Sequence, residues 1–260
     1  MGSVDLSPLM SDWPYDPERI SVRKILGSDG RIKIQMRTEL GLMQLEVTGR
    51  PDGARSGGHD TVLEMHLASL RDHQRRNGTT FGFAINSEDC SSLREEAGMF
   101  HHRYVCLFVL DEYDGVERDT CHHISILDLC RQFAADREDQ LALETTRPYV
   151  LSMQARAAAL RNLREGKPRD ALNLVDRGIL RIQDHLEQIG QSQHLDDIPE
   201  AEILRELRQE LLNIIPEPPK RKLRRQLRTA VKEERYEDAA RFRDALAREP
   251  DTSNDPPAAP

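Results

Sequence analysis

Four cysteines and four histidines in the middle of the chain are the residues whose types could bind a metal ion. They are Cys90, His101, His102, Cys106, Cys121, His122, His123 and Cys130. Structural zinc sites usually take ligands in close pairs such as Cys-x2-Cys, and this segment contains no such pair. Adjacent histidines on a helix also point to different faces. The spacing favours reduced, buried thiols and surface histidines, so we expect no metal and no cofactor.

Signals for catalysis are weaker still. Gly49–Gly58 is rich in glycine but lacks the Gly-Lys-Ser/Thr ending of a phosphate-binding loop, and the sequence has no Gly-x-Ser-x-Gly elbow. Carboxylates occur in helical segments near Arg or Lys, as Glu237 does at helical spacing before Arg241, which is typical of surface pairs. We therefore expect a protein that is not an enzyme.

The composition indicates a globular, helix-rich chain. Of the 260 residues, 38% are hydrophobic and 32% are charged, and the mean hydropathy is −0.64. This balance is usual where amphipathic helices show much of their surface to water. Apolar runs such as Val105–Leu110 are far shorter than the roughly 20 residues that cross a bilayer. The segment Met1–Ile20 lacks the features of a signal peptide, so we expect a cytoplasmic protein and no membrane contact.

The N-terminal part predicts an arm followed by a small sheet. Residues 1–19 contain three prolines and no apolar period, so we expect an extended arm that Trp13 and Tyr15 attach to the body. Residues 20–85 are expected to form a three-stranded antiparallel meander and one helix. The turn between the first two strands is predicted at Gly27–Gly30.

The faces of this sheet follow from the alternation of its second strand. Ile32, Ile34 and Met36 are expected to be buried together, with Lys33 and Gln35 exposed. A third strand is predicted at Leu42–Thr48, followed by a turn-rich segment. The helix expected at Thr61–Arg76 is the nearest candidate to cover the apolar face.

Helical hairpins are predicted for residues 86–190. Asn86 or Ser87 is expected to cap the first helix, a turn at Tyr113–Gly115 to lead into the second, and Pro148 to start the third. The junction Glu165–Leu172 weakly resembles the turn of a tetratricopeptide repeat. Comparable turns near Tyr113 and Tyr236 are too widely and unevenly spaced for that repeat's period, which favours plain helical hairpins.

Two further helical modules are predicted near the C-terminus. Residues 201–215 form an amphipathic helix that ends at the proline run Pro216–Pro219. Residues 220–249 then hold an apolar stripe within a basic helix, followed by a second helix with paired alanines. Residues 250–260 are expected to be a disordered tail.

This second module resembles the UVR motif. The family pattern is leucines at helical spacing, an alanine, an aromatic-acidic pair, Ala-Ala, Arg-Asp and an aliphatic residue, and it is filled by Leu223, Leu227, Ala230, Tyr236, Glu237, Ala239, Ala240, Arg243, Asp244 and Leu246. In this family the motif is a two-helix hairpin that pairs the excision-repair proteins UvrB and UvrC and mediates contacts of Clp-type ATPases. A continuous helix is the alternative structure.

The resemblance implies a protein partner. The expected contact residues are Leu223, Leu227, Ala230, Tyr236, Ala239, Ala240, Arg243 and Leu246. The partner is expected to be a protein, with another UVR-containing protein or a second copy of this chain as the alternatives.

Charge suggests a different use for the same helix. Six residues could contact a nucleic acid: Lys220, Arg221, Lys222, Arg224, Arg225 and Arg228. The segment 217–249 holds 11 basic and 7 acidic residues, whereas residues 1–216 carry a net charge of −10. No aromatic residues interleave with the basic ones, so nucleic-acid contact is not favoured.

Together these patterns predict an α+β protein that is mostly α. It should contain a small antiparallel sheet domain, a helical-hairpin middle and a C-terminal UVR hairpin. The expected function is that of a non-enzymatic adaptor that docks through the hairpin. The alternatives are a DNA-binding accessory of nucleotide excision repair and an enzyme with a site between the sheet and the helices.

Overall fold

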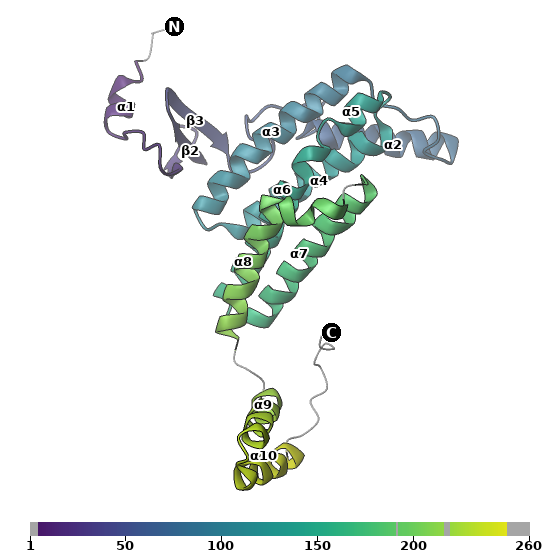
Figure 1. Cartoon of the computed structure of the whole chain (residues 1–260). Coiled ribbons are helices and arrows are strands. Elements are labelled where there is room, and N and C mark those ends of the chain that lie inside the picture. Colours follow the sequence, from purple (N-terminus) through teal and green to yellow (C-terminus); the bar gives the residue numbers. More distant parts are fainter. Residues whose placement is uncertain (1–4, 191, 216–218, 249–260) are drawn as a thin grey trace. The chain divides into compact units, whose positions relative to one another are not determined.

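The structure is a computed structural model that describes residues 5–190, 192–215 and 219–248. Contacts divide the chain after Leu212 into two units. The described elements, labelled as in Figure 1, are α1 (Ser7–Ser11), β1 (Ser21–Leu26), β2 (Ile32–Thr38), β3 (Gly41–Glu46), α2 (Val62–Asn77), α3 (Ser87–Val109), α4 (Tyr113–Phe133), α5 (Arg137–Leu141), η1 (Glu144–Thr146), α6 (Arg147–Arg164), α7 (Pro168–Gln188), η2 (Ser192–Asp197), α8 (Pro199–Ile214), α9 (Pro219–Lys232) and α10 (Tyr236–Arg248).

The predicted fold class is confirmed: a small antiparallel sheet precedes a chain of helical hairpins. The strand order is β1-β2-β3, with Lys24 opposite Ile34 and Ile34 opposite Leu45. The predicted tail, residues 250–260, lies outside the described residues. Within the predicted extended arm, one helical turn (α1) begins next to Pro8, which is favoured at the start of a helix.

The burial predicted for β2 is only partly correct. Ile34 is fully buried and Met36 is buried less completely, but Ile32 at the start of the strand is 46% exposed. Lys33 and Gln35, predicted to be exposed, are buried instead. The prediction assumed that the second face of the sheet is open to solvent, whereas this face is covered.

Polar contacts and the N-terminal arm cover that second face. Lys33 pairs with Asp29 and Glu46, while Gln35 bonds Arg23 on β1 and Gln44 on β3. The arm lies against the same strands: Arg23 packs 4.2 Å from the centre of the Trp13 ring, and Arg37 donates to the Trp13 carbonyl at 2.8 Å. The arm is therefore attached through Trp13, with arginines as the points of contact.

Helices α3, α4 and α6, rather than α2, cover the apolar face of the sheet. Ile34 and Leu45 share a core with Tyr104 and Leu107 of α3, Tyr113 and Val116 of α4, and Met153 and Ala157 of α6. The prediction that the helix at residues 61–76 would do this is wrong. Helix α2 instead joins a different core with α3 and α4, where Val62 and Leu63 lie with Cys90, Leu93, Ala97 and Ile126.

The position of α2 is fixed by a carboxylate from α3. The first backbone N–H groups of α2, those of Val62 and Leu63, donate to the buried Glu96 side chain at 2.6 and 3.0 Å. Burial alone would raise the pKa of Glu96, but these bonds and His122 outweigh it and lower the pKa. An anion at a helix N-terminus satisfies donors that have no partner within the helix.

Close helix packing explains two glycines that sequence patterns assigned to turns or left unexplained. The turn predicted at Tyr113–Gly115 is displaced, because α4 already begins at Tyr113. A Cβ at Gly115 would lie 2.9 Å from Leu107, so this glycine allows α3 and α4 to approach closely. A Cβ at Gly178 of α7 would lie 2.5 Å from the Cβ of Ala155 on α6. The hairpin α6–α7 closes through this contact.

A buried ion pair joins the sheet to the helices. Arg103 on α3 and Asp119 on α4 are 1% and 0% exposed, and two guanidinium nitrogens of Arg103 reach both carboxylate oxygens at 2.6 and 2.8 Å. The third nitrogen donates to the carbonyls of Glu46 and Gly49 at the end of β3. The pair therefore satisfies backbone groups where the chain leaves the sheet.

Replacing Asp119 with Asn should strongly destabilise the first unit. The change removes the carboxylate that compensates the buried charge of Arg103, which costs about 3 to 5 kcal/mol. Urea denaturation followed by circular dichroism measures this loss. Asp114→Asn is the control on the same helix: its carboxylate pairs with Arg161 but is 86% exposed, and the change should cost less than about 1 kcal/mol. Equal losses in the two variants would contradict the assigned role of the pair.

Candidate protein-interaction site

The C-terminal unit contains a two-helix hairpin, α9–α10, with a tight turn at Glu233–Arg235. Glu234 has φ of +59°, the left-handed region that favours glycine. The N–H of Arg235 donates to the carbonyl of Ala230 at 2.8 Å, and that of Glu234 to Val231 at 3.2 Å. This is the pair of bonds that ends many helices with a left-handed residue. The predicted hairpin is confirmed, and a single continuous helix is excluded.

The same turn occurs in the two large hairpins of the first unit. Asp111 between α3 and α4 has φ of +60°, and Gly166 between α6 and α7 has φ of +73°. In each case the N–H of the next residue bonds a carbonyl in the last turn of the helix, from Glu112 to Leu107 and from Lys167 to Asn162. The following helix then begins almost at once. One local device therefore builds all three hairpins.

Side-chain contacts at the turn reinforce it. Arg235 donates to Glu233, the residue after α9, at 2.7 Å and to Asp238, in the first turn of α10, at 2.6 Å. Both contacts raise the pKa of the Arg235 guanidinium, Glu233 more than Asp238. Asp238 also lies where a negative charge stabilises a helix N-terminus. The side chains at the turn thus compensate for the absence of a glycine.

Two alanines form the centre of the contact between the helices. Ala230 is 0% exposed and Ala239 is 7% exposed, whereas the larger residues of the stripe, Leu223, Leu227 and Leu246, are half-buried. Small side chains at these two positions let the two backbones come close. Because Ala230 and Ala239 are buried within the hairpin itself, neither presents its side chain at the surface.

Two expected contact residues lie outside this interior. Tyr236 is 69% exposed, so it does not pack among the leucines of the hairpin. Arg243 is also exposed. Phe242, absent from the expected contact residues, is half-buried and lines a hollow of about 230 Å³ with Arg225, Gln226, Thr229 and Arg235. Its helical spacing from Ala239 and Leu246 was the signal that could have identified it.

The hairpin therefore has two different open faces. Ala230 and Ala239 mark where α9 and α10 face each other. Because the two helices run antiparallel, helical geometry places Val231 of α9 and Tyr236 of α10 on the same side of the hairpin, next to this contact. Val231 is 52% exposed and Ala240, on the same side, is half-buried. We call the set Val231, Tyr236 and Ala240 the apolar flank. The hollow at Thr229 and Phe242 lies on the opposite side.

The basic residues of the hairpin are concentrated on α9. Lys222, Arg224 and Arg228 are exposed and form no ion pair with another described residue. Arginines of α10 have acidic neighbours: Arg243 contacts Asp244 at 3.0 Å, and Arg241 lies 3.8 Å from Asp238. The side chains of Lys220 and Arg221, which were also expected to contact nucleic acid, lie outside the described part of the chain.

The cysteines and histidines of the first unit are mostly packed in its interior. Cys90, Cys106 and Cys130 are buried, and burial raises the pKa of Cys106 and Cys130 to about 12. Cys121 is exposed, and His123, expected at the surface, is buried with a pKa lowered to about 4 by burial. Over the described residues, no group of three or more His, Cys, Asp or Glu side chains is arranged to hold a metal ion.

Comparison with known families identifies the hairpin. A family described as UvrB/uvrC motif (UVR) matches residues 220–248, which span α9 and α10. The match covers about a ninth of the chain. No curated protein and no solved structure matches the sequence. The chain therefore carries a UVR motif at the end of its described part, and this motif indicates a role in protein or DNA interaction. No described helix is long and apolar enough to cross a membrane.

Glu234→Gly should stabilise the hairpin. A residue with a Cβ pays about 1 kcal/mol or more to hold the left-handed conformation, and glycine avoids most of this cost. Amide hydrogen exchange of the full chain should show slower exchange at Arg235, whose N–H closes the turn on Ala230. Glu233→Gly, one residue earlier and without a positive φ, should not give this protection. Faster exchange in Glu234→Gly would contradict the assigned turn.

Proposed function

We propose that this protein is a non-enzymatic adaptor that docks onto a protein partner through its UVR hairpin. The observation that carries the proposal is the apolar flank: Val231 and Tyr236 expose 52% and 69% of their surface on a hairpin whose alanine core is already closed. Exposed apolar groups gathered on one small module are typical of interaction surfaces.

The size of the hairpin supports this proposal. Two helices of 14 and 13 residues bury few described side chains fully, and those are the small ones, Ala230 and Ala239. A module of this size has too little apolar interior for high stability alone. Covering Val231 and Tyr236 with a partner's apolar surface would add burial at about 25 cal/mol per Å². Docking and hairpin stability are then coupled.

Charge supports a partner of a particular kind. The exposed Arg224 and Arg228, four residues apart, give α9 a positive face, so the partner's surface should be apolar at its centre and acidic at its edge. Another UVR-containing protein fits the apolar requirement, because its hairpin would offer a similar stripe. Its acidic residues would then determine the pairing.

Val231→Asp and Ala240→Glu should each abolish docking without unfolding the first unit. Both changes place an unpaired charge on the apolar flank, and burying such a charge in an interface costs several kcal/mol, on the order of 100-fold or more in affinity. Pull-downs from lysate with the full chain measure partner recovery, and melting curves measure folding. A chain truncated after Ile215 lacks the hairpin and should lose the same partners that these two variants lose.

Thr229→Asp is the matched control for this experiment. Thr229 is an exposed residue of α9, as Val231 is, and both changes introduce one aspartate. Thr229, however, faces the hollow beside Phe242 and not the apolar flank. It should recover the wild-type partners. If Val231→Asp and Ala240→Glu also recover all of them while the melting curves are unchanged, the apolar flank is not the docking surface.

A DNA-binding accessory of excision repair is the second candidate function. The observation that favours it is the set of exposed basic side chains on α9, Lys222, Arg224 and Arg228, which form no ion pair within the part of the chain that the structure describes. Each phosphate that such a side chain neutralises makes the binding constant fall more steeply with salt. The whole chain's net charge of −8 opposes this function.

Salt dependence separates the two candidates. If α9 contacts duplex DNA, replacing Lys222, Arg224 and Arg228 together with Gln should reduce the slope of log K against log salt by about 0.9 for each phosphate that is no longer neutralised. Fluorescence anisotropy with a labelled duplex measures the slope. Under the adaptor proposal, wild type and the triple variant show equally weak DNA binding at physiological salt.

A further inference from the structure

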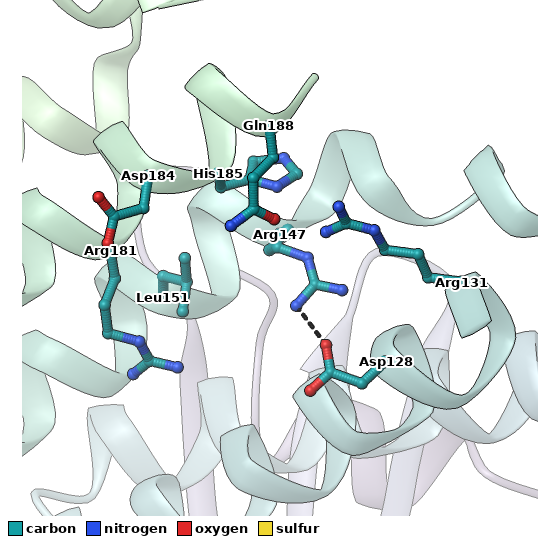
Figure 2. A pocket seen from close by; sticks show the side chains of 8 residues that line it. All are labelled: Asp128, Arg131, Arg147, Leu151, Arg181, Asp184, His185 and Gln188. Carbon is teal, nitrogen blue, oxygen red and sulfur yellow. Dashed lines mark hydrogen bonds and ion pairs between the residues drawn. The ribbon is translucent and has the colours of Figure 1, made fainter. Parts of the chain in front are cut away.

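A polar cleft lies between α4, α6 and α7 in the first unit and is separate from the hairpin. It has a volume of about 260 Å³ and is lined by Asp128, Arg131, Arg147, Leu151, Arg181, Asp184, His185 and Gln188. Figure 2 shows the guanidinium groups of Arg131 and Arg147 and the amide of Gln188 turned toward a common space, while Arg181 points away from them. The lining is therefore rich in hydrogen-bond donors.

The floor of the cleft is held in place by a buried ion pair. Arg147 is buried, and two of its nitrogens reach both oxygens of the buried Glu144 at 2.7 and 2.8 Å. Its remaining terminal nitrogen donates to Asp128 at 2.7 Å. A guanidinium has five N–H donors, and these three bonds leave two of them without a partner among the described residues. Glu144 therefore fixes Arg147 in an orientation that presents donors to the cleft.

Two more side chains have unused capacity at the same place. His185 is 4% exposed, and neither of its ring nitrogens has a hydrogen-bond partner among the described residues, although Nδ1 lies 3.5 Å from Glu144. Burial lowers its pKa, so the ring is neutral at neutral pH and offers one N–H donor. Arg131 is partly exposed, and its contact with Glu144 is as long as 4.0 Å. Buried polar groups without partners are rare, and here the His185 ring lies beside Arg131 and Arg147 around one cleft.

Asp128 places a carboxylate of the chain itself at the donors of the cleft. Its side chain is 62% exposed, yet its carboxylate accepts a hydrogen bond from Nη1 of the buried Arg147. An external anion could take the same place, because an exposed carboxylate can rotate into solvent. Charges on distant parts of the surface are screened beyond about 10 Å at ordinary salt, so the charges in and beneath the cleft itself govern it. These are three arginines, Arg131, Arg147 and Arg181, and the carboxylates of Asp128, Asp184 and Glu144.

We propose that this cleft is an anion site that binds a phosphate group of a small molecule, with Arg131, Arg147, Gln188 and His185 as donors and Asp128 as a competing internal carboxylate. A phosphate has more acceptor oxygens than a carboxylate and matches several donors from different elements. The volume of about 260 Å³ lies just below the roughly 300 to 1,000 Å³ that is usual for small-molecule pockets, which suits a phosphate with a small organic body. This site is independent of the docking function.

Titration of the full chain with inorganic phosphate at constant ionic strength and neutral pH tests the proposal. Nuclear magnetic resonance of the arginine Nε–H groups follows the Arg131 and Arg147 signals. We expect saturable shifts with a dissociation constant on the order of 1 mM, since inorganic phosphate is only a fragment of the ligand. Acetate and chloride at the same ionic strength should give much weaker shifts.

Variants in the cleft should change affinity in opposite directions. Asp128→Asn removes the competing carboxylate and should tighten phosphate binding about fivefold, and Arg131→Gln should weaken it by about the same factor. Arg177→Gln, which replaces an exposed arginine one turn before Arg181 on α7, is the control and should bind as wild type does. A defect in folding could not produce the tighter binding expected for Asp128→Asn.

Three results would overturn the proposal. Absence of saturable shifts in both wild type and Asp128→Asn would show that the cleft does not bind phosphate. Equal weakening in Arg131→Gln and Arg177→Gln would show general attraction to surface arginines. Acetate binding as tightly as phosphate would make the cleft a carboxylate site instead.

Discussion

A single backbone constraint underlies the helical part of this protein: each of three hairpins needs one residue in the left-handed conformation between its helices. Asp111, Gly166 and Glu234 fill this position, and in each case the second helix starts almost immediately afterwards. Because the connections are so short, the two helices of each hairpin are antiparallel neighbours that pack closely. The small residues Gly115, Gly178 and Ala230 at the contacts make this close packing possible. The polar cleft and the apolar flank are both formed by helices placed in this way.

Local sequence patterns predicted most of the helices and strands. They failed where residues distant in sequence determine the burial of a side chain or the position of a helix. Alternation identified the strands, and the paired alanines with spaced leucines identified the terminal hairpin. Burial of Lys33 and Gln35 depends on Glu46, Gln44 and the N-terminal arm, which no pattern within β2 reveals. The placement of α2 away from the sheet depends on Glu96, which belongs to the following helix, α3. Tertiary hydrogen bonds of this kind have no local signature.

The candidate sites divide in the same way. The UVR hairpin is a local motif, so its two helices could be predicted, although the half-buried Phe242 was not among the residues expected to matter. The polar cleft could not be predicted, because Arg131, Arg147 and His185 come from three different helices. In both cases a buried contact, the alanines in one and the Glu144–Arg147 ion pair in the other, positions the groups that remain exposed around it.

The central claim is that the apolar flank of the UVR hairpin is the surface covered by the partner. Hydrogen–deuterium exchange of the full chain, free and in the complex recovered from cells, tests this most directly. We predict slower exchange on complex formation in α9 and α10 around Val231 and Ala240, with the amides of α3, α4 and α6 unchanged. Protection confined to the first unit, with the hairpin exchanging as in the free protein, would contradict this claim.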